Sequence, residues 1–90
     1  MFFKRKFERE IVKDCVVDCS SSGWTCSGQT VDLSEGGMRL EMEIIPNIHE
    51  KVELYMNCES GRQLNKKAIV VWFIKKERPE EGAIVGLKFS

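Results

Sequence analysis

Hydrophobic and polar residues alternate along most of the chain, in short runs separated by clusters of Gly, Ser, Pro and charged residues. Alternation over four to eight residues is typical of a β-strand that buries one face. The pattern predicts six such strands and no helix after residue 11. The predicted strands cover residues 11–19, 24–34, 38 to 44 or 45, 51–56, 68–74 and 83–89.

Residues 68–74 form the only continuous apolar run of the chain. Seven residues rich in β-branched and aromatic side chains predict a strand that is buried on both faces. Six antiparallel strands in ninety residues are best accommodated in a closed barrel, because closure leaves no exposed strand edges. We therefore expect one all-β domain over residues 1–90, with the barrel formed by residues 11–90.

The charges are balanced overall but uneven along the chain. Fourteen Lys and Arg offset fourteen Asp and Glu, so no net field favours nucleic acid or an anionic membrane as a partner. Four cations nevertheless fall within the first nine residues, with Glu8 as their only acidic neighbour. Residues 1–10 are therefore predicted to form a basic, flexible arm that meets an anionic partner, although Phe3, Phe7 and Ile11 would also suit a short helix.

The stretch Asp-Leu-Ser-Glu-Gly-Gly, which begins at Asp32, ends one predicted strand and forms the turn to the next. Alternation directs Val31 and Leu33 toward a core, and therefore places Asp32 and Ser34 together on the opposite, solvent-facing side. Gly37 can take a positive φ or allow another group to approach the backbone closely. An ordinary hairpin turn would also use these residue types.

Two arginines separated by three residues, Arg5 and Arg9, lie upstream of this turn. A guanidinium offers a planar fork of donors that fits a phosphate or the O6/N7 edge of guanine. Asp32 can accept hydrogen bonds from guanine amide and amino groups, which a site for a bare anion would not need. Together with the close approach that Gly37 permits, the residues favour a guanine nucleotide as ligand. The alternative for the arginines is a solvated terminal charge cluster.

At this point the sequence resembles a known family, the PilZ domains. Residues 5–9 (RKFER) and 32–37 (DLSEGG) match the RxxxR and [D/N]xSxxG motifs of that family in order and spacing. The end of the chain is also similar, with an apolar strand that contains Trp72, a turn, and then IVGLKF at residues 84–89. The resemblance covers nearly all ninety residues.

The resemblance implies a six-stranded antiparallel β-barrel that binds the bacterial second messenger cyclic di-GMP. Arg5 and Arg9 would contact guanine and phosphate, often around an intercalated dimer of the ligand, while Asp32, Ser34 and Gly37 would line the barrel surface. We expect a receptor that is not an enzyme, whose arm becomes ordered on the ligand and is then recognised by a protein partner. Many PilZ domains add a C-terminal helix after the last strand, and from this sequence we expect none.

Catalytic chemistry is not indicated by the sequence. The single histidine, His49, falls in a polar loop, and no carboxylate pair or Cys-His arrangement stands out, so we expect no catalytic residue, metal or cofactor. The chain shows no signal-peptide or membrane-spanning run, which predicts a cytoplasmic protein without membrane insertion. The four cysteines lack the spacing of zinc sites, and cytosolic thiols stay reduced, so buried free thiols are expected.

Two other functions remain open from the sequence. A small barrel could bind single-stranded nucleic acid, with the arm on phosphates and Trp24 or Trp72 stacking on bases. The neutral charge argues against it, and Trp72 belongs to the most apolar run, which favours a core position. The chain could also be a PilZ-like adaptor that acts only through protein contacts. The intact arginines and turn motif argue against this function, because a domain without a ligand would not need them.

Overall fold

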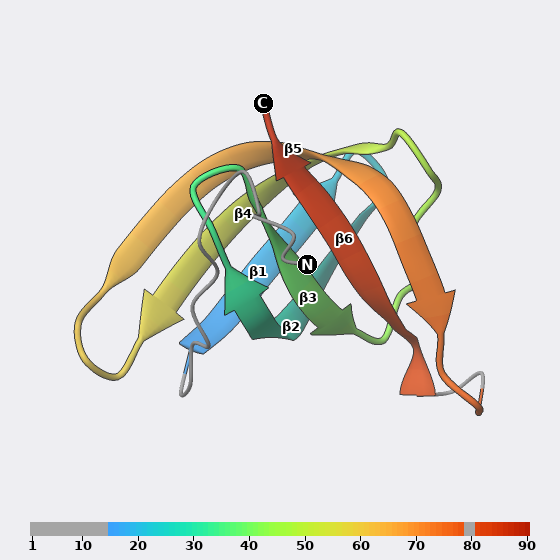
Figure 1. The fold of residues 1–90 in the computed structure, drawn as a ribbon, viewed down its shortest axis with the longest axis horizontal. Helices are drawn as coiled ribbons and strands as arrows, with labels where there is room; N and C mark the ends of the chain where they lie inside the picture. The colour runs from blue at the N-terminus through green and yellow to red at the C-terminus, as the bar shows by residue number, and fades with distance from the viewer. Residues whose placement is uncertain (1–14, 79–80) are drawn as a thin grey trace, which may run out of the picture.

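The computed structural model describes residues 15–78 and 81–90, and these form a closed antiparallel β-barrel (Figure 1). Going round the barrel, the strands follow the order β1-β2-β3-β6-β5-β4, and β4 pairs with β1 to close it. The predicted all-β, six-stranded barrel is therefore confirmed. The strands are β1 (Cys15–Ser21), β2 (Trp24–Leu33), β3 (Gly37–Met42), β4 (Lys51–Cys58), β5 (Gln63–Lys75) and β6 (Ala83–Phe89).

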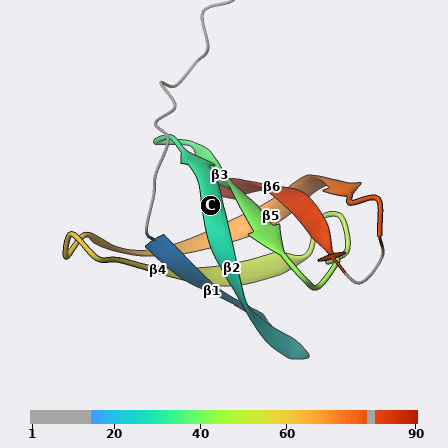
Figure 2. The ribbon, with the colours of Figure 1, turned by 90° about the horizontal axis from the view of Figure 1, so that it is seen from below.

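The last strand, β6, lies between β3 and β5 (Figures 1 and 2). It therefore pairs both with the strand that precedes it in the sequence and with β3. Its pairing with β3 runs from Gly37 opposite Lys88 to Met42 opposite Ala83. This register brings the end of the chain against the turn between β2 and β3, where the amide of Phe89 donates to the Gly36 carbonyl at 2.9 Å. The turn that carries the DLSEGG motif, which we call the motif turn, is thus connected to β2 and β3 and is also hydrogen-bonded to the end of β6.

The barrel interior is filled largely by alternate residues of the strands, as predicted, and the alternation is interrupted by a bulge in β2 and another in β5. In β4 the buried residues alternate strictly with exposed ones. In β1 the buried Cys15, Val17 and Cys19 alternate with outward residues, among them Val16, which is 52% exposed although apolar. The largest side chains that are fully buried are Met38, Leu40, Leu54, Met56, Val17, Val70 and Val85.

Strand β5 differs from the prediction in length and in burial. It begins at Gln63 and spans 13 residues, and only one of its faces is buried. Val70 is fully buried, whereas Val71 is 41% and Ile74 is 63% exposed. A β-bulge between Val70 and Trp72 shifts the register, which explains how a continuous apolar run can serve a strand whose outer face meets solvent.

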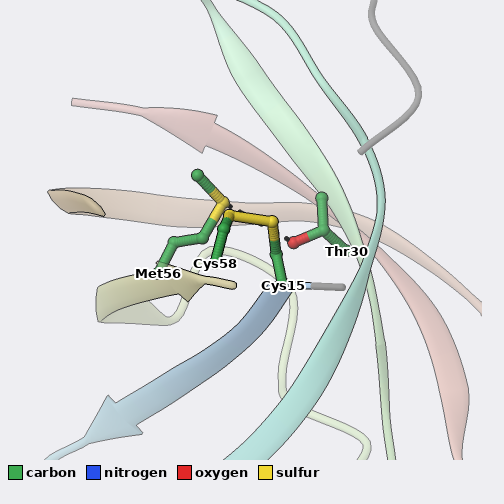
Figure 3. Close-up of a disulfide and its surroundings, with 4 residues drawn as sticks. All are labelled: Cys15, Thr30, Met56 and Cys58. Atoms are coloured by element: carbon green, nitrogen blue, oxygen red, sulfur yellow. Dashed lines mark hydrogen bonds between the residues drawn. A yellow bond between two sulfur atoms is a disulfide. The ribbon is translucent and has the colours of Figure 1, made fainter. Parts of the chain in front are cut away.

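The expectation of free thiols is wrong for two of the four cysteines. Cys15 and Cys58 form a disulfide between the start of β1 and the end of β4 (Figure 3). The register of the β1–β4 pair places the two residues directly opposite each other, with their Cα atoms 4.0 Å apart. Their separation of 43 positions in the sequence gave no sign of this contact. Cys19 and Cys26 are free thiols.

The one-sided burial of β5 can be tested with two alanine variants of that strand. Val70→Ala should lower the free energy of unfolding by about 2 kcal/mol, because it removes buried methyl groups and leaves a cavity. Ile74→Ala, the matched control on the outer face, should change it by less than about 0.5 kcal/mol. Urea denaturation followed by circular dichroism measures both values, and equal losses would contradict the one-sided burial.

Candidate functional site

The turn between β2 and β3 is closed by Ser34. Its amide donates to the carbonyl oxygen of Gly37 at 2.9 Å, and its hydroxyl donates to the same oxygen at 3.3 Å. A serine that bonds a backbone group a few residues away is a common way to stabilise a turn. The side chain is half-buried, so Ser34 holds the shape of the turn and lies at the edge of the exposed surface.

Asp32 forms the strongest polar contact of the site, with Arg39 on the neighbouring strand. The two residues lie opposite each other in the β2–β3 register, and the Arg39 Nε donates to Asp32 Oδ2 at 2.7 Å while Nη2 contacts the same oxygen. The Asp32 side chain is only 6% exposed. The predicted solvent-exposed carboxylate is therefore incorrect, because Asp32 is buried and engaged with a cation.

The Asp32 carboxylate also affects the charge state of its partner. Its hydrogen bond raises the pKa of the Arg39 guanidinium above the ordinary value, and the opposing desolvation is smaller. Arg39 consequently stays protonated under all physiological conditions. Its side chain is 38% exposed, so part of the guanidinium faces solvent while the carboxylate fixes its position.

A β-bulge explains why alternation misplaced Val31. Thr30 pairs with Leu40 and Asp32 pairs with Arg39, so two residues of β2 span a single step of β3 and Val31 has no partner. Val31 is half-buried instead of joining the core, whereas Leu33 is buried as predicted. A prediction from strict alternation assumes that every residue faces the side opposite to its neighbour, so it cannot detect the extra residue of a bulge.

The strand registers place Asp32, Arg39, Gly86 and Trp72 in one row across β2, β3, β6 and β5. Arg39 lies opposite Gly86, and Gly86 lies opposite Trp72. Residues next to them in β3 and β6 are buried, so the row faces outward. We call these four residues the outer row. Arg39 and Trp72 are two strands apart, roughly 10 Å at the usual strand spacing.

Gly86 allows the indole of Trp72 to lie flat on the barrel. A Cβ atom at this position would overlap the indole ring. The ring therefore covers the backbone of β6 and remains half-exposed beside the Arg39 position. The outer row thus presents a fixed guanidinium and an aromatic surface, two groups that can both stack on a nucleobase. The expectation that Trp72 is a core residue is not met.

Gly37 serves a different purpose from the predicted one. It is buried, and a Cβ atom there would overlap the backbone carbonyl of Leu87 on β6. Its φ is not among the positive values, which occur at Gly61, Gly82 and His49. The close approach that the glycine permits is therefore made by a strand of the same barrel, and Gly37 lets β6 pair tightly with the turn.

The structure brings Asp32, Ser34 and Gly37 together at one turn, as the motif spacing indicated. Arg5 and Arg9 lie outside the described residues, so their contacts stay predictions. Sequence reasoning missed Arg39, although its outward position on the third predicted strand was a usable signal. Knowledge of the bulge was needed to see that it faces Asp32.

The described part of the chain offers neither a metal-binding cluster nor a membrane-spanning helix. In residues 15–78 and 81–90 no group of three or more His, Cys, Asp or Glu side chains is placed to hold a metal ion. Over the same ranges there is no helix with the length and apolar character needed to cross a membrane. His49 lies exposed in the loop before β4, where its φ is 71°.

The family model of the PilZ domain matches residues 3–90. The chain belongs to the PilZ domain family. Among curated proteins, none matches the sequence convincingly. The fold of this PilZ domain is similar to two solved structures at low sequence identity.

One of these is the inhibitor of motility MotI/DgrA from Bacillus subtilis, with a TM-score of 0.78 and 17% identity. The similarity covers 99% of this chain and 44% of that protein, so this PilZ domain spans less than half of its length. The other is the PilZ domain of YcgR from Escherichia coli, solved with c-di-GMP, with a TM-score of 0.73 and 13% identity. It is matched over 97% of this chain and 78% of that one.

The packing role of Gly37 predicts a loss of stability when the residue is enlarged. Gly37→Ala should lower the free energy of unfolding by about 1–3 kcal/mol, because the methyl group would push β6 away from the turn. Gly23→Ala is the matched control, since nothing lies within 4 Å of a Cβ atom there. Urea denaturation of both variants measures the difference. A Gly37→Ala protein as stable as wild type would show that the glycine is not needed for packing.

Proposed function

We propose that this PilZ domain is a receptor for cyclic di-GMP and that the ligand binds over the outer row beside the motif turn. The observation that supports this most is the placement of Arg39 and Trp72 on the face that carries Asp32, because a guanidinium and an indole suit a planar, anionic nucleotide. The similarity in fold to a PilZ domain solved with this ligand adds support.

Arg39 and Trp72 have separate roles in this proposal. The guanidinium of Arg39, kept charged and in place by Asp32, binds a phosphate or the O6/N7 edge of guanine. The indole of Trp72, supported from below by Gly86, stacks on a guanine ring. Because both groups are already positioned in the free protein, these two side chains need little ordering when the ligand arrives.

The arm supplies the second side of the proposed site. Arg5 and Arg9 close over the ligand and neutralise its two phosphates, so the nucleotide is held between the arm and the barrel. Asp32 first holds Arg39 in place, and its carboxylate can in addition accept hydrogen bonds from guanine amide and amino groups. Ser34 and Gly37 act through the shape of the turn.

The signal that follows from binding is a changed surface. When the arm becomes ordered against the outer row, it covers residues that were exposed and presents new ones, and a protein partner can distinguish the two states. This proposal describes a receptor that is not an enzyme and that needs no cofactor besides its ligand.

Calorimetric titration with cyclic di-GMP at near-physiological salt tests the receptor function. We expect saturable binding, absent with GTP, and an affinity that falls roughly 10- to 100-fold in Arg9→Ala, because hydrogen bonds to charged groups are worth roughly 1.5–3 kcal/mol. Arg78→Ala is the matched control, since Arg78 is an exposed arginine that pairs with Glu81 in its own loop at 3.8 Å. It should bind like wild type.

The other outcomes of this titration are equally clear. A flat titration of folded protein would reject the receptor function and favour the adaptor. Binding of single-stranded oligonucleotides with a steep dependence on salt and no preference for a base would favour the nucleic-acid barrel. If Arg9→Ala bound as tightly as wild type, the arm would not contribute to the site.

Tryptophan fluorescence can locate the ligand on the barrel. In Trp24→Phe protein only Trp72 emits, and we expect its emission to change on addition of cyclic di-GMP because the base stacks on the indole. In Trp72→Phe protein only Trp24 emits, and its indole donates to Glu50 at 2.9 Å away from the outer row. That emission should stay constant. The opposite pattern would place the ligand elsewhere.

A further inference from the structure

The Cys15–Cys58 disulfide lies at the point where the predicted arm joins the barrel. Cys15 is the first residue of β1, and Cys58 is the last residue of β4, so the bond closes the end of the β1–β4 seam. Arg9 precedes Cys15 by six positions in the sequence. A fully extended chain of six residues is roughly 20 Å long. The position of Cys15 therefore limits where Arg9 can act.

The disulfide also packs behind the residues that position the outer row. Figure 3 shows the Thr30 hydroxyl directed toward the disulfide and the Met56 sulfur, to which it donates at 3.8 Å. Thr30 is the last paired residue of β2 before the bulge, and Asp32 is the first after it. Thr30 therefore lines the same cavity as the two cysteines and lies next to the bulge that precedes Asp32.

The disulfide can be reached from solvent. Both cysteines are almost buried, 6% and 7% exposed, yet they line an open cavity of about 640 Å³. The cavity is also lined by the exposed residues Asp18 of β1, Tyr55 of β4 and Glu59 after β4. This volume is large enough for a small thiol to approach a sulfur atom. A purely structural disulfide in a closed core would have no such access.

We propose that Cys15 and Cys58 form a thiol–disulfide switch that sets the affinity of the outer row for its ligand. This proposal rests on the proposed function. The disulfide holds the seam, Thr30 and the bulge in the arrangement that positions Asp32 and Arg39. When the bond is reduced, the ends of β1 and β4 lose their covalent link and keep the hydrogen bonds of the strand ladder, and ligand binding must order them.

The chemistry is ordinary thiol–disulfide exchange and balances with a small thiol as reductant. A thiolate attacks one sulfur of the Cys15–Cys58 bond, which gives a mixed disulfide and releases the other cysteine as a thiolate that takes a proton from water. A second small thiolate attacks the mixed disulfide and releases the remaining cysteine. The protein gains two electrons and two protons, and two small thiols become one disulfide. Oxidised glutathione, a low-molecular-weight disulfide, reverses the reaction.

Of the two free cysteines, the buried Cys19 does not compete in this exchange. Cys19 and Cys26 lie opposite each other in the β1–β2 register but are not bonded. Burial raises the pKa of the Cys19 thiol to about 12, with smaller contributions from Cys26 and Glu50. Since the thiolate is the nucleophile, Cys19 stays inert near neutral pH. The switch therefore involves one defined pair.

The test compares cyclic di-GMP binding by oxidised and reduced wild-type protein in calorimetric titrations. Thiol counting should give two thiols in the oxidised protein and four in the reduced one. We expect reduction to weaken binding about 5- to 30-fold, which corresponds to the ordering of one backbone residue. The Cys15→Ser, Cys58→Ser double variant should bind like reduced protein with or without reductant. Cys26→Ser, the control, should keep the full response.

Each outcome decides between the two proposals. If neither redox state binds, the receptor function fails and the switch fails with it. If both states bind equally, the receptor function stands and the switch is overturned. If circular dichroism shows that the reduced protein is unfolded, the bond is a structural crosslink and the switch is likewise overturned. If the double variant does not fold, the wild-type comparison still decides.

Discussion

The insertion of β6 between β3 and β5 is the constraint on which the rest of the molecule depends. Its hydrogen bonds to both neighbours complete the barrel, and its register creates the outer row. Two glycines make the insertion possible, because Gly37 lets the backbone of β6 approach the turn and Gly86 leaves room for the Trp72 ring. The motif turn, the barrel closure and the aromatic surface are therefore consequences of one pairing arrangement.

The Asp32–Arg39 pair shows how a buried charge can serve an exposed function. A carboxylate that is 6% exposed needs a partner, and Arg39 supplies two donors from the next strand. In return the guanidinium is fixed where part of it still faces solvent. The acidic residue of the motif and the basic residue that follows it thus act as one unit, and removing either would leave the other without its main contact.

Several features of the fold could be predicted from the sequence because they depend on local periodicity. Alternation located all six strands, with the bounds of Ala83–Phe89 matched at both ends, and short strands in a short chain favoured closure. The two bulges, after Thr30 and after Val70, were invisible to it, because each adds one residue without changing the composition. For that reason the burial of Val31 and of β5 was misjudged. Asp32 does lie on the predicted outward face, but it is buried there in its pairing with Arg39.

The sequence by itself determined the strand pattern, the turn motif and the family, since these are properties of residue order over short distances. Only the tertiary structure decided which distant residues meet. Cys15 and Cys58 are 43 positions apart, and Arg39 and Trp72 belong to strands that become near neighbours only through β6. Strand order and register arise from packing of the whole barrel, and no local pattern encodes them.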